Sequence, residues 1–336
     1  MKTIYYVLES TGWVQHKRIE YFRELIPDIK FRVISVKNFL RLRSIGLMRK
    51  SYFYFASWRS LHPILKEKPN FFKPSDYERF MTSVTSHMNI GGGLDPQKAI
   101  SFRRPDEAME IATALLKKYK IVTVNSMALY ELLSAKIENI YYCPNGVDID
   151  FYNPDGKKPY DKDEITIGWT GKIRISKNYE TIEEAFRQLK EIGFKINEVV
   201  VTKDMKQIPL DNHGMAKYYK TIDYYLCASW NEGTPNPGLE AASSGAVVVS
   251  TRVGNMRELI REGDTGFFVE PTVESIVSVF KKIKELDNLD YQRMSRNIRS
   301  EICNNWNWNR QIKNYNSAFN ALLNNGFKGT SPFAGV

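Results

Sequence analysis

Hydrophobic residues along the chain fall into short β-branched or aromatic runs that alternate with longer amphipathic stretches. Residues 3–8 have the composition of a buried strand, whereas residues 15–26 place their apolar side chains at helical spacing. In the first half of the chain the same patterns predict further strands at 31–36, 80–85, 121–124 and 140–143, and helices at 105–119 and 126–135. Strands that alternate with helices require crossover connections, so the pattern predicts an α/β fold with a mostly parallel sheet.

A second alternating set follows a turn-rich, charged stretch at residues 144–163, which we interpret as an inter-domain linker. Its predicted strands are 165–170, 196–201, 224–227, 246–249 and 266–269, and its predicted helices are 178–192, 238–244, 255–261 and 273–286, before two helical stretches in 291–325. The predicted domains are therefore 1–150, 151–304 and a final helix at 305–325. Two such α/β domains are expected to bind a ligand beyond the carboxyl ends of their strands.

Composition favours an ordinary globular protein with two domains, because 336 residues exceed one comfortable core and 43% of them are hydrophobic. The apolar runs are only a few residues long, and the first residues do not resemble a signal peptide, so neither a membrane span nor secretion is expected. The three cysteines, Cys143, Cys227 and Cys303, are scattered, which favours a reducing compartment. We therefore expect a cytoplasmic protein.

The net charge of +10 is unevenly divided. Residues 1–150 carry 23 basic and 15 acidic side chains, whereas residues 151–336 carry 25 and 23. Within the basic half, cationic side chains alternate with aromatic rings in the segment 37–73. The aromatic residues of this segment are Phe39, Tyr52, Phe53, Tyr54, Phe55, Trp58, Phe71 and Phe72. This arrangement fits an anionic partner such as nucleic acid, lipid headgroups or a phosphorylated substrate. It equally fits elements whose rings face the core and whose cations face water.

The most specific chemical pattern lies in residues 229–250, where Glu232 and Glu240 are separated by seven residues. Glu232 falls in a Gly/Pro-rich loop at a predicted strand end, and Glu240 falls just inside the following helix. Carboxylates in this context can accept hydrogen bonds from vicinal hydroxyls. The amides of Thr234, Asn236 and Gly238, at the start of that helix, are expected to be available to phosphate or sugar oxygens.

The two glutamates resemble the paired glutamates of retaining GT-B glycosyltransferases of family 4 (GT4), which use nucleotide sugars. Other stretches match that family in the same order. Residues 168–182 resemble its segment with two phosphate-binding cations, residues 144–148 its domain-joining turn, and residues 253–269 the segment after the second glutamate. The resemblance is strong over residues 140–271.

The resemblance implies two Rossmann-like domains that face a central cleft, with the C-terminal helix packed back on the N-terminal domain. It also implies that Lys177 and Lys172 neutralise the donor diphosphate, which is electrostatic catalysis that requires no metal ion. The family usually has arginine where this chain has Lys172, and Arg174 is an alternative partner of Lys177. By the same resemblance Glu240 binds the ribose hydroxyls, and Glu232 faces the transferred sugar.

Two further site residues are expected in the N-terminal half. His87 follows a predicted strand, where a cleft residue near the donor sugar and a structural hydrogen bond are both reasonable interpretations. Gly12 occupies the place of the family's N-terminal glycine loop. Asp148 and Asp150 form a D-x-D pattern, but it lies in the expected linker turn, and neither an HExxH motif nor a Cys/His cluster is present, so no metal or other cofactor is expected.

The sequence thus predicts a retaining, metal-independent glycosyltransferase of the hexosyltransferase type. The expected partners are a nucleotide-diphospho sugar and an anionic acceptor or membrane surface that meets the basic N-terminal half. A glycan or lipid-linked glycan is the first interpretation for the acceptor, with peripheral attachment at the inner membrane surface. Duplex DNA with hydroxymethylated bases is an alternative, as are a small-molecule acceptor and a non-catalytic sugar-nucleotide-binding module. A NAD enzyme is disfavoured because no GxGxxG follows Leu8.

Overall fold

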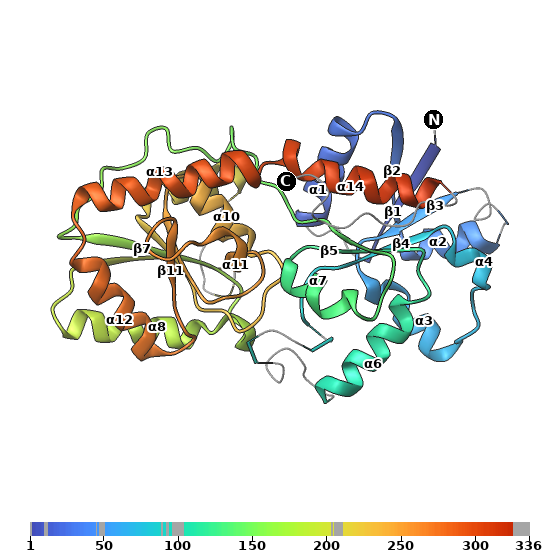
Figure 1. Cartoon of the computed structure of the whole chain (residues 1–336), viewed down its shortest axis with the longest axis horizontal. Helices are drawn as coiled ribbons and strands as arrows, with labels where there is room; N and C mark the ends of the chain where they lie inside the picture. Colours follow the sequence, from blue (N-terminus) through green and yellow to red (C-terminus); the bar gives the residue numbers. More distant parts are fainter. Residues whose placement is uncertain are drawn as a thin grey trace. The chain divides into compact units, whose positions relative to one another are not determined.

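A computed structural model describes residues 2–9, 13–44, 46, 51–88, 90–91, 94–95, 104–202, 204 and 211–324. The chain divides into two compact units (Figure 1). The N-terminal unit comprises the described residues of Met1–Gly91, Phe102–Asn145 and Trp308–Val336, and the C-terminal unit comprises those of Gly92–Ser101 and Gly146–Asn307. The chain passes from the first alternating set of strands and helices to the second between Asn145 and Gly146.

The N-terminal unit is built on a six-stranded sheet with the order β2-β1-β3-β4-β5-β6. All neighbouring strands are parallel, as the alternation of elements predicted. The strands are β1 (Lys2–Leu8), β2 (Ile29–Ser35), β3 (Tyr52–Phe55), β4 (Phe80–Val84), β5 (Ile121–Val124) and β6 (Ile140–Tyr142). Their carboxyl ends share one edge of the sheet, which is where a doubly wound fold binds ligands.

Helices cover both faces of this sheet. One face packs against α1 (Trp13–Leu25) and the C-terminal helix α14 (Trp308–Leu323). The rings of Phe22 on α1 and Phe319 on α14 meet edge to face, with their centroids 5.1 Å apart. The hydroxyl of Tyr315 on α14 also donates a hydrogen bond of 2.8 Å to the Cys143 carbonyl. The opposite face packs against α2 (Val36–Ser44), η2 (Trp58–Leu61), α3 (His62–Glu67), α4 (Pro74–Tyr77), α6 (Pro105–Leu116) and α7 (Met127–Ser134).

The aromatic rings of residues 37–73 are used in the core of this unit. β3 lies inside the sheet between β1 and β4, and Phe39, Phe53 and Phe55 are fully buried around it. Trp58 and Phe72 are buried as well. Buried rings cannot stack on nucleic-acid bases or enter a membrane interface. For these five residues, the interpretation in which the rings face the core is therefore correct.

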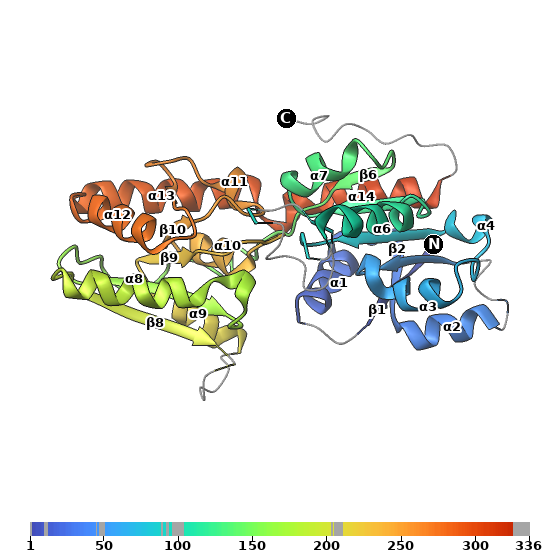
Figure 2. The same ribbon diagram turned by 90° about the horizontal axis from the view of Figure 1, so that it is seen from below.

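The C-terminal unit contains a five-stranded parallel sheet with the order β11-β10-β9-β7-β8. Its strands are β7 (Ile165–Gly171), β8 (Ile196–Thr202), β9 (Tyr224–Cys227), β10 (Val247–Ser250) and β11 (Gly266–Phe268). One face packs against α8 (Tyr179–Glu191) and α12 (Val273–Lys284), which lie side by side (Figure 2). The other packs mainly against α9 (Asn212–Thr221), α10 (Asn236–Ser243), α11 (Met256–Leu259) and α13 (Asn288–Asn305).

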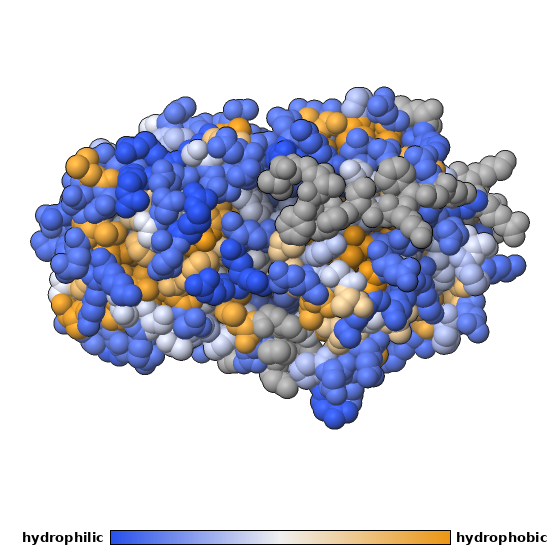
Figure 3. Space-filling view, in the orientation of Figure 1, coloured by the Kyte–Doolittle hydropathy of each residue, from blue (hydrophilic) through white to orange (hydrophobic). Residues whose placement is uncertain are grey.

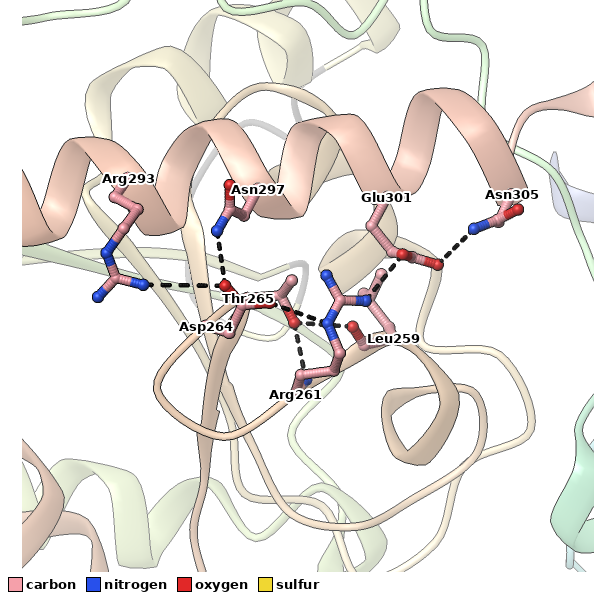
Figure 4. A network of polar contacts seen from close by, with 8 residues as sticks. All are labelled: Leu259, Arg261, Asp264, Thr265, Arg293, Asn297, Glu301 and Asn305. Atoms are coloured by element: carbon pink, nitrogen blue, oxygen red, sulfur yellow. Dashed lines mark hydrogen bonds and ion pairs between the residues drawn. The ribbon is translucent and has the colours of Figure 1, made fainter.

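Helix α13 holds the turn that leads into β11 through a polar network (Figure 4). Arg261 donates to Asp264 at 2.9 Å and to Glu301 of α13 at 2.9 Å, and Asn297 of α13 donates to Asp264 at 2.6 Å. The hydrogen bonds from Arg261 and Asn297 lower the pKa of Asp264. Inside the turn, the buried Thr265 hydroxyl donates to the Leu259 carbonyl at 3.0 Å. Part of the segment at 253–269 is therefore structural.

None of the helices in the described ranges combines the length and apolar character needed to cross a bilayer. On the face drawn in Figure 3, hydrophobic residues lie in small groups among hydrophilic ones.

Candidate functional site

Two loops at the carboxyl edge of the C-terminal sheet bring Lys177 and Glu232 together. Lys177 ends the short helix η3 (Ile175–Lys177) after β7, and Glu232 lies in the loop after β9. Because β7 and β9 are neighbours in the sheet, their following loops meet. The Lys177 ammonium forms an ion pair with Oε1 of Glu232, and the Trp230 amide donates to the Ser176 carbonyl at 2.9 Å. Residues 55 positions apart thus form one site.

Glu232 is held by a second donor that sequence reasoning did not identify. The Ser229 hydroxyl donates to the same oxygen, Oε1, at 2.9 Å. Ser229 is itself buried two residues after the end of β9, and its carbonyl accepts a hydrogen bond of 2.7 Å from the Thr251 hydroxyl. Of the described residues, none contacts Oε2 of Glu232 through a hydrogen bond or ion pair. One carboxylate oxygen is therefore fixed by the protein while the other stays available.

The ion pair is only partly exposed to solvent. The side chain of Lys177 is 27% exposed and that of Glu232 is 12% exposed. Burial lowers the pKa of Lys177, but the nearby charge of Glu232 and its hydrogen bond outweigh burial, so the pKa of Lys177 is raised overall. Lys177 is therefore a cation at neutral pH. Its charge is poorly screened, which strengthens its interaction with any nearby anion.

A strained residue fixes the backbone immediately after Lys177. Asn178 has a φ of +54°, the left-handed conformation that is uncommon for a residue other than glycine. Its side-chain amide donates to the Pro271 carbonyl at 3.0 Å, and its carbonyl oxygen accepts from the Thr181 hydroxyl at 2.9 Å. Both ends of the Asn178 side chain are thus satisfied, which holds Lys177 at the start of α8.

The two other expected cations, Lys172 and Arg174, lie in the same loop and are exposed. The Ile173 amide between them donates to Asp204 at 2.5 Å, which ties this loop to the end of β8. Neither cation forms an ion pair with a described residue. The positive charge of Arg174 acts against the raised pKa of Lys177.

Glu240 lies on α10 and is contacted from α9. The hydroxyl of Tyr219, which is fully buried, donates to Oε2 of Glu240 at 2.9 Å. Burial and the nearby Glu240 charge raise the pKa of Tyr219, so this hydroxyl keeps its proton and acts as a donor. Neither α9 nor Tyr219 was anticipated from the sequence. This hydrogen bond fixes the orientation of the Glu240 carboxylate.

Comparison with known proteins gives a family match for part of the C-terminal unit. Residues 164–286, which include Lys177, Glu232 and Glu240, match the family model described as Glycosyl transferases group 1. No curated protein matches the chain.

Solved structures match the chain over nearly its whole length. Sucrose-phosphate synthase from Thermosynechococcus elongatus is 14% identical with a TM-score of 0.72, over 96% of this chain and 99% of that chain. HepE from Anabaena, in complex with UDP and glucose, is 14% identical with a TM-score of 0.67, over 95% and 100%. A glycosyltransferase from Rickettsia africae is 17% identical with a TM-score of 0.65, over 97% and 99%. The chain has the GT-B fold.

In the C-terminal unit of this GT-B fold, the loop that carries Glu232 packs directly against the turn before α11. Gly254 has a φ of +48°, and a Cβ at this position would lie 2.1 Å from the Gly233 carbonyl oxygen. Only glycine permits this approach. Gly254 therefore sets the path of the backbone next to Glu232.

The amides expected to be available beside Glu232 are partly occupied. The Asn236 amide donates to the Thr234 carbonyl at 2.9 Å, and the Gly238 amide donates to the Pro235 carbonyl at 2.8 Å. The prediction that these two amides are available to a ligand is therefore wrong for this conformation. The side chains of Thr234 and Asn236 remain part of the loop between Glu232 and Glu240.

The turn at residues 144–148, which resembles the domain-joining turn of the family, makes hydrogen bonds within the protein. In the N-terminal unit, Arg18 donates to the side chain of Asn145 at 2.9 Å. In the C-terminal unit, the Val147 amide donates to the Trp306 carbonyl at 2.8 Å, and Asp148 accepts from the Phe151 amide at 3.0 Å. Within the described ranges, no group of three or more His, Cys, Asp or Glu side chains is placed to hold a metal ion.

His87 belongs to the N-terminal GT-B unit. Gly12 lies outside the described residues. His87 follows β4, is 3% exposed, and neither ring nitrogen has a hydrogen-bond partner among the described residues. Burial lowers the pKa of His87 from 6.5 to about 4, so the imidazole is neutral at pH 7. The structure thus gives no support to a structural hydrogen bond for His87 within the described part of the chain.

The buried His87 leads to a prediction about acid stability. The pKa of His87 is lower in the folded state than in the unfolded state. The contribution of the neutral His87 to the free energy of unfolding is therefore fully present above pH 6.5 and is lost as the pH falls toward 4. Between pH 7 and 4.5, the free energy of unfolding should fall by about 2 to 3 kcal/mol more in the natural protein than in His87→Leu. Urea unfolding at the two pH values measures this difference.

The matched control is His213→Leu, because His213 is exposed on α9. That variant should keep the full pH dependence of the natural protein. Equal pH dependence in the natural protein and His87→Leu would show that His87 does not resist protonation.

Proposed function

We propose that this protein is a retaining, metal-independent glycosyltransferase of the GT4 type, which moves a sugar from a nucleotide-diphospho sugar to an acceptor hydroxyl. The observation that carries the proposal is the contact between Lys177 and Glu232 at the carboxyl edge of the C-terminal sheet. A cation for phosphate and a carboxylate for hydroxyls lie within one hydrogen bond of each other, and Glu240 follows on the adjoining helix. The match of residues 164–286 to group 1 glycosyl transferases supports the same conclusion.

In this mechanism Lys177 stabilises the leaving diphosphate. Negative charge grows on the diphosphate as its bond to the sugar breaks, so a fixed cation binds the transition state more strongly than the ground state. Arg174 or Lys172 supplies a second positive charge from the same loop. These cations take the role that a divalent metal ion has in other transferases.

The carboxylates orient the two ends of the donor. Glu232 accepts hydrogen bonds from hydroxyls of the transferred sugar and stabilises the positive charge that develops at its anomeric carbon. Glu240, oriented by Tyr219, accepts from the ribose hydroxyls. A phosphate oxygen of the departing group then takes the proton of the acceptor hydroxyl on the same face of the sugar, which retains the anomeric configuration.

We further propose that the acceptor is a glycan or a lipid-linked glycan, and that His87 contacts the donor sugar. A neutral imidazole at that position offers one donor and one acceptor to sugar hydroxyls. Its two ring nitrogens, which have no partner among the described residues, are the observation that favours this role. UDP is the first nucleotide to test, since the HepE structure holds UDP.

A ligand panel tests the proposed function. Thermal unfolding is measured with UDP, GDP and ADP and with their glucose and N-acetylglucosamine derivatives, because a ligand that binds only the folded state raises its apparent stability. The proposal expects one nucleotide series to stabilise the protein, and the matching sugar donor to release nucleoside diphosphate when an acceptor is added. Binding without release or transfer would identify a non-catalytic module, and binding of none of these compounds would contradict the proposal.

The Tyr219 contact gives a second test of the nucleotide site. Tyr219→Phe removes the hydroxyl that orients Glu240, so the KM for the donor should rise about three- to tenfold while kcat changes little. Tyr218→Phe is the matched control, because the Tyr218 hydroxyl donates to the Val199 carbonyl instead. Steady-state kinetics of both variants measure the difference, and an unchanged KM in Tyr219→Phe would argue against a ribose role for Glu240.

A further inference from the structure

Lys177 and Glu232, which the proposed function assigns to different parts of the donor, are bound to each other in this structure. A diphosphate that binds Lys177 must therefore share the ammonium group with the Glu232 carboxylate, which lies in direct contact with it. Both side chains are largely shielded from water, so solvent screens their charges only weakly.

Glu232 cannot easily move away from the diphosphate. The Ser229 hydroxyl fixes Oε1 at 2.9 Å, and Ser229 is buried and anchored in turn by Thr251. The carboxylate therefore stays beside Lys177 whether or not a ligand is present. Any diphosphate at Lys177 meets this negative charge at close range, which disfavours its binding.

We infer that Glu232, held by Ser229, makes the site select a nucleotide sugar over the free nucleoside diphosphate. This inference rests on the proposed function. A nucleotide sugar brings hydroxyl groups that donate to the available oxygen of Glu232, Oε2, and so offset its negative charge beside the diphosphate. The free nucleoside diphosphate brings no such donors and leaves the carboxylate uncompensated beside its own negative charge.

The same negative charge assists turnover. After the sugar has left, no hydroxyl remains on Glu232, and the negative charge of its carboxylate beside the nucleoside diphosphate favours departure of the product. No covalent bond changes in this step. Glu232 therefore acts at two stages, as a sugar ligand in the donor complex and as a charge that repels the product in the product complex.

Isothermal titration calorimetry with four forms of the protein tests the inference. The forms are the natural protein, Glu232→Gln, Lys177→Gln and the double variant, and the probes are UDP, GDP, ADP, their glucose derivatives and pyrophosphate. Glu232→Gln should bind the preferred nucleoside diphosphate and pyrophosphate about tenfold more tightly than the natural protein does. It should bind the corresponding sugar donor no more tightly, so the preference for the donor falls. In the Lys177→Gln background, adding Glu232→Gln should give no comparable gain, because the effect passes through Lys177.

Two further variants complete the design. Ser229→Ala should reduce the preference for the nucleotide sugar over the nucleoside diphosphate, but by less than Glu232→Gln does. This variant keeps the carboxylate and loses only the hydroxyl that anchors it. Glu198→Gln, which removes a carboxylate paired with Lys190 in the same unit, should change neither affinity. If Glu232→Gln binds nucleoside diphosphate no more tightly than the natural protein, the inference is wrong while the proposed function stands. If the natural protein binds none of the nucleotides, the proposed function itself fails and the inference with it.

Discussion

Replacing Lys177 with alanine is expected to lower the rate of sugar transfer by about 10² to 10³-fold, the loss typical of a preorganised group that stabilises transition-state charge. Lys177 is the cation in direct contact with Glu232, and the strained Asn178 backbone holds it at the start of α8. Lys172 and Arg174 are exposed, so solvent screens their charges more strongly than that of Lys177. Single-turnover kinetics at saturating donor separate this loss from weaker binding.

Folding stability should change much less than the transfer rate. The Lys177 side chain is partly exposed, so loss of its ion pair should reduce the free energy of unfolding by about 1 to 2 kcal/mol at most. Lys190→Ala is the matched control, because Lys190 lies on α8 and pairs with Glu198 away from Glu232. Transfer at the natural rate by Lys177→Ala would rule out the proposed phosphate role.

The hydrophobic pattern was sufficient to predict the parallel α/β architecture. Strands buried on both faces have continuous apolar runs, and β5 and β9 were predicted with the bounds that the structure shows. The short strand β3 was not predicted, because its four aromatic residues lie among cations and fit a buried helix as well as a strand. Helix α9 was also missed, because Gly214 and several polar residues weaken its helical pattern.

Loop position and spacing single out Glu232 and Glu240 in the sequence, and the family resemblance adds Lys177. The sequence did not indicate Ser229 and Tyr219, because a serine or tyrosine acquires such a role only through tertiary contacts. The pairing of Lys177 with Glu232 likewise depends on β7 lying next to β9 in the sheet, an order that hydrophobic periodicity does not specify. The amides of Asn236 and Gly238 were misjudged for a related reason, because local turn bonds occupy them.

Replacing Gly254 with alanine is expected to affect both folding and transfer, although Gly254 has no functional group. The added Cβ would lie 2.1 Å from the Gly233 carbonyl oxygen, so the backbone beside Glu232 must move. The positive φ of Gly254 adds further strain. We expect a loss of about 2 to 4 kcal/mol in the free energy of unfolding. We also expect at least about a 100-fold loss of transfer, because Glu232 would be displaced from its position next to Lys177.

Gly263→Ala separates these two causes. Gly263 also has a positive φ, of +71°, but an added Cβ meets no atom within 4 Å. The free energy of unfolding of this variant should therefore fall only by the cost of the backbone strain, about 1 kcal/mol. The variant should transfer sugar at nearly the natural rate. Urea unfolding and initial-rate assays on both variants measure the comparison. If Gly254→Ala matches Gly263→Ala in both measurements, the contact with Gly233 does not control the position of Glu232, and the loop must be held by Ser229 and Trp230 instead.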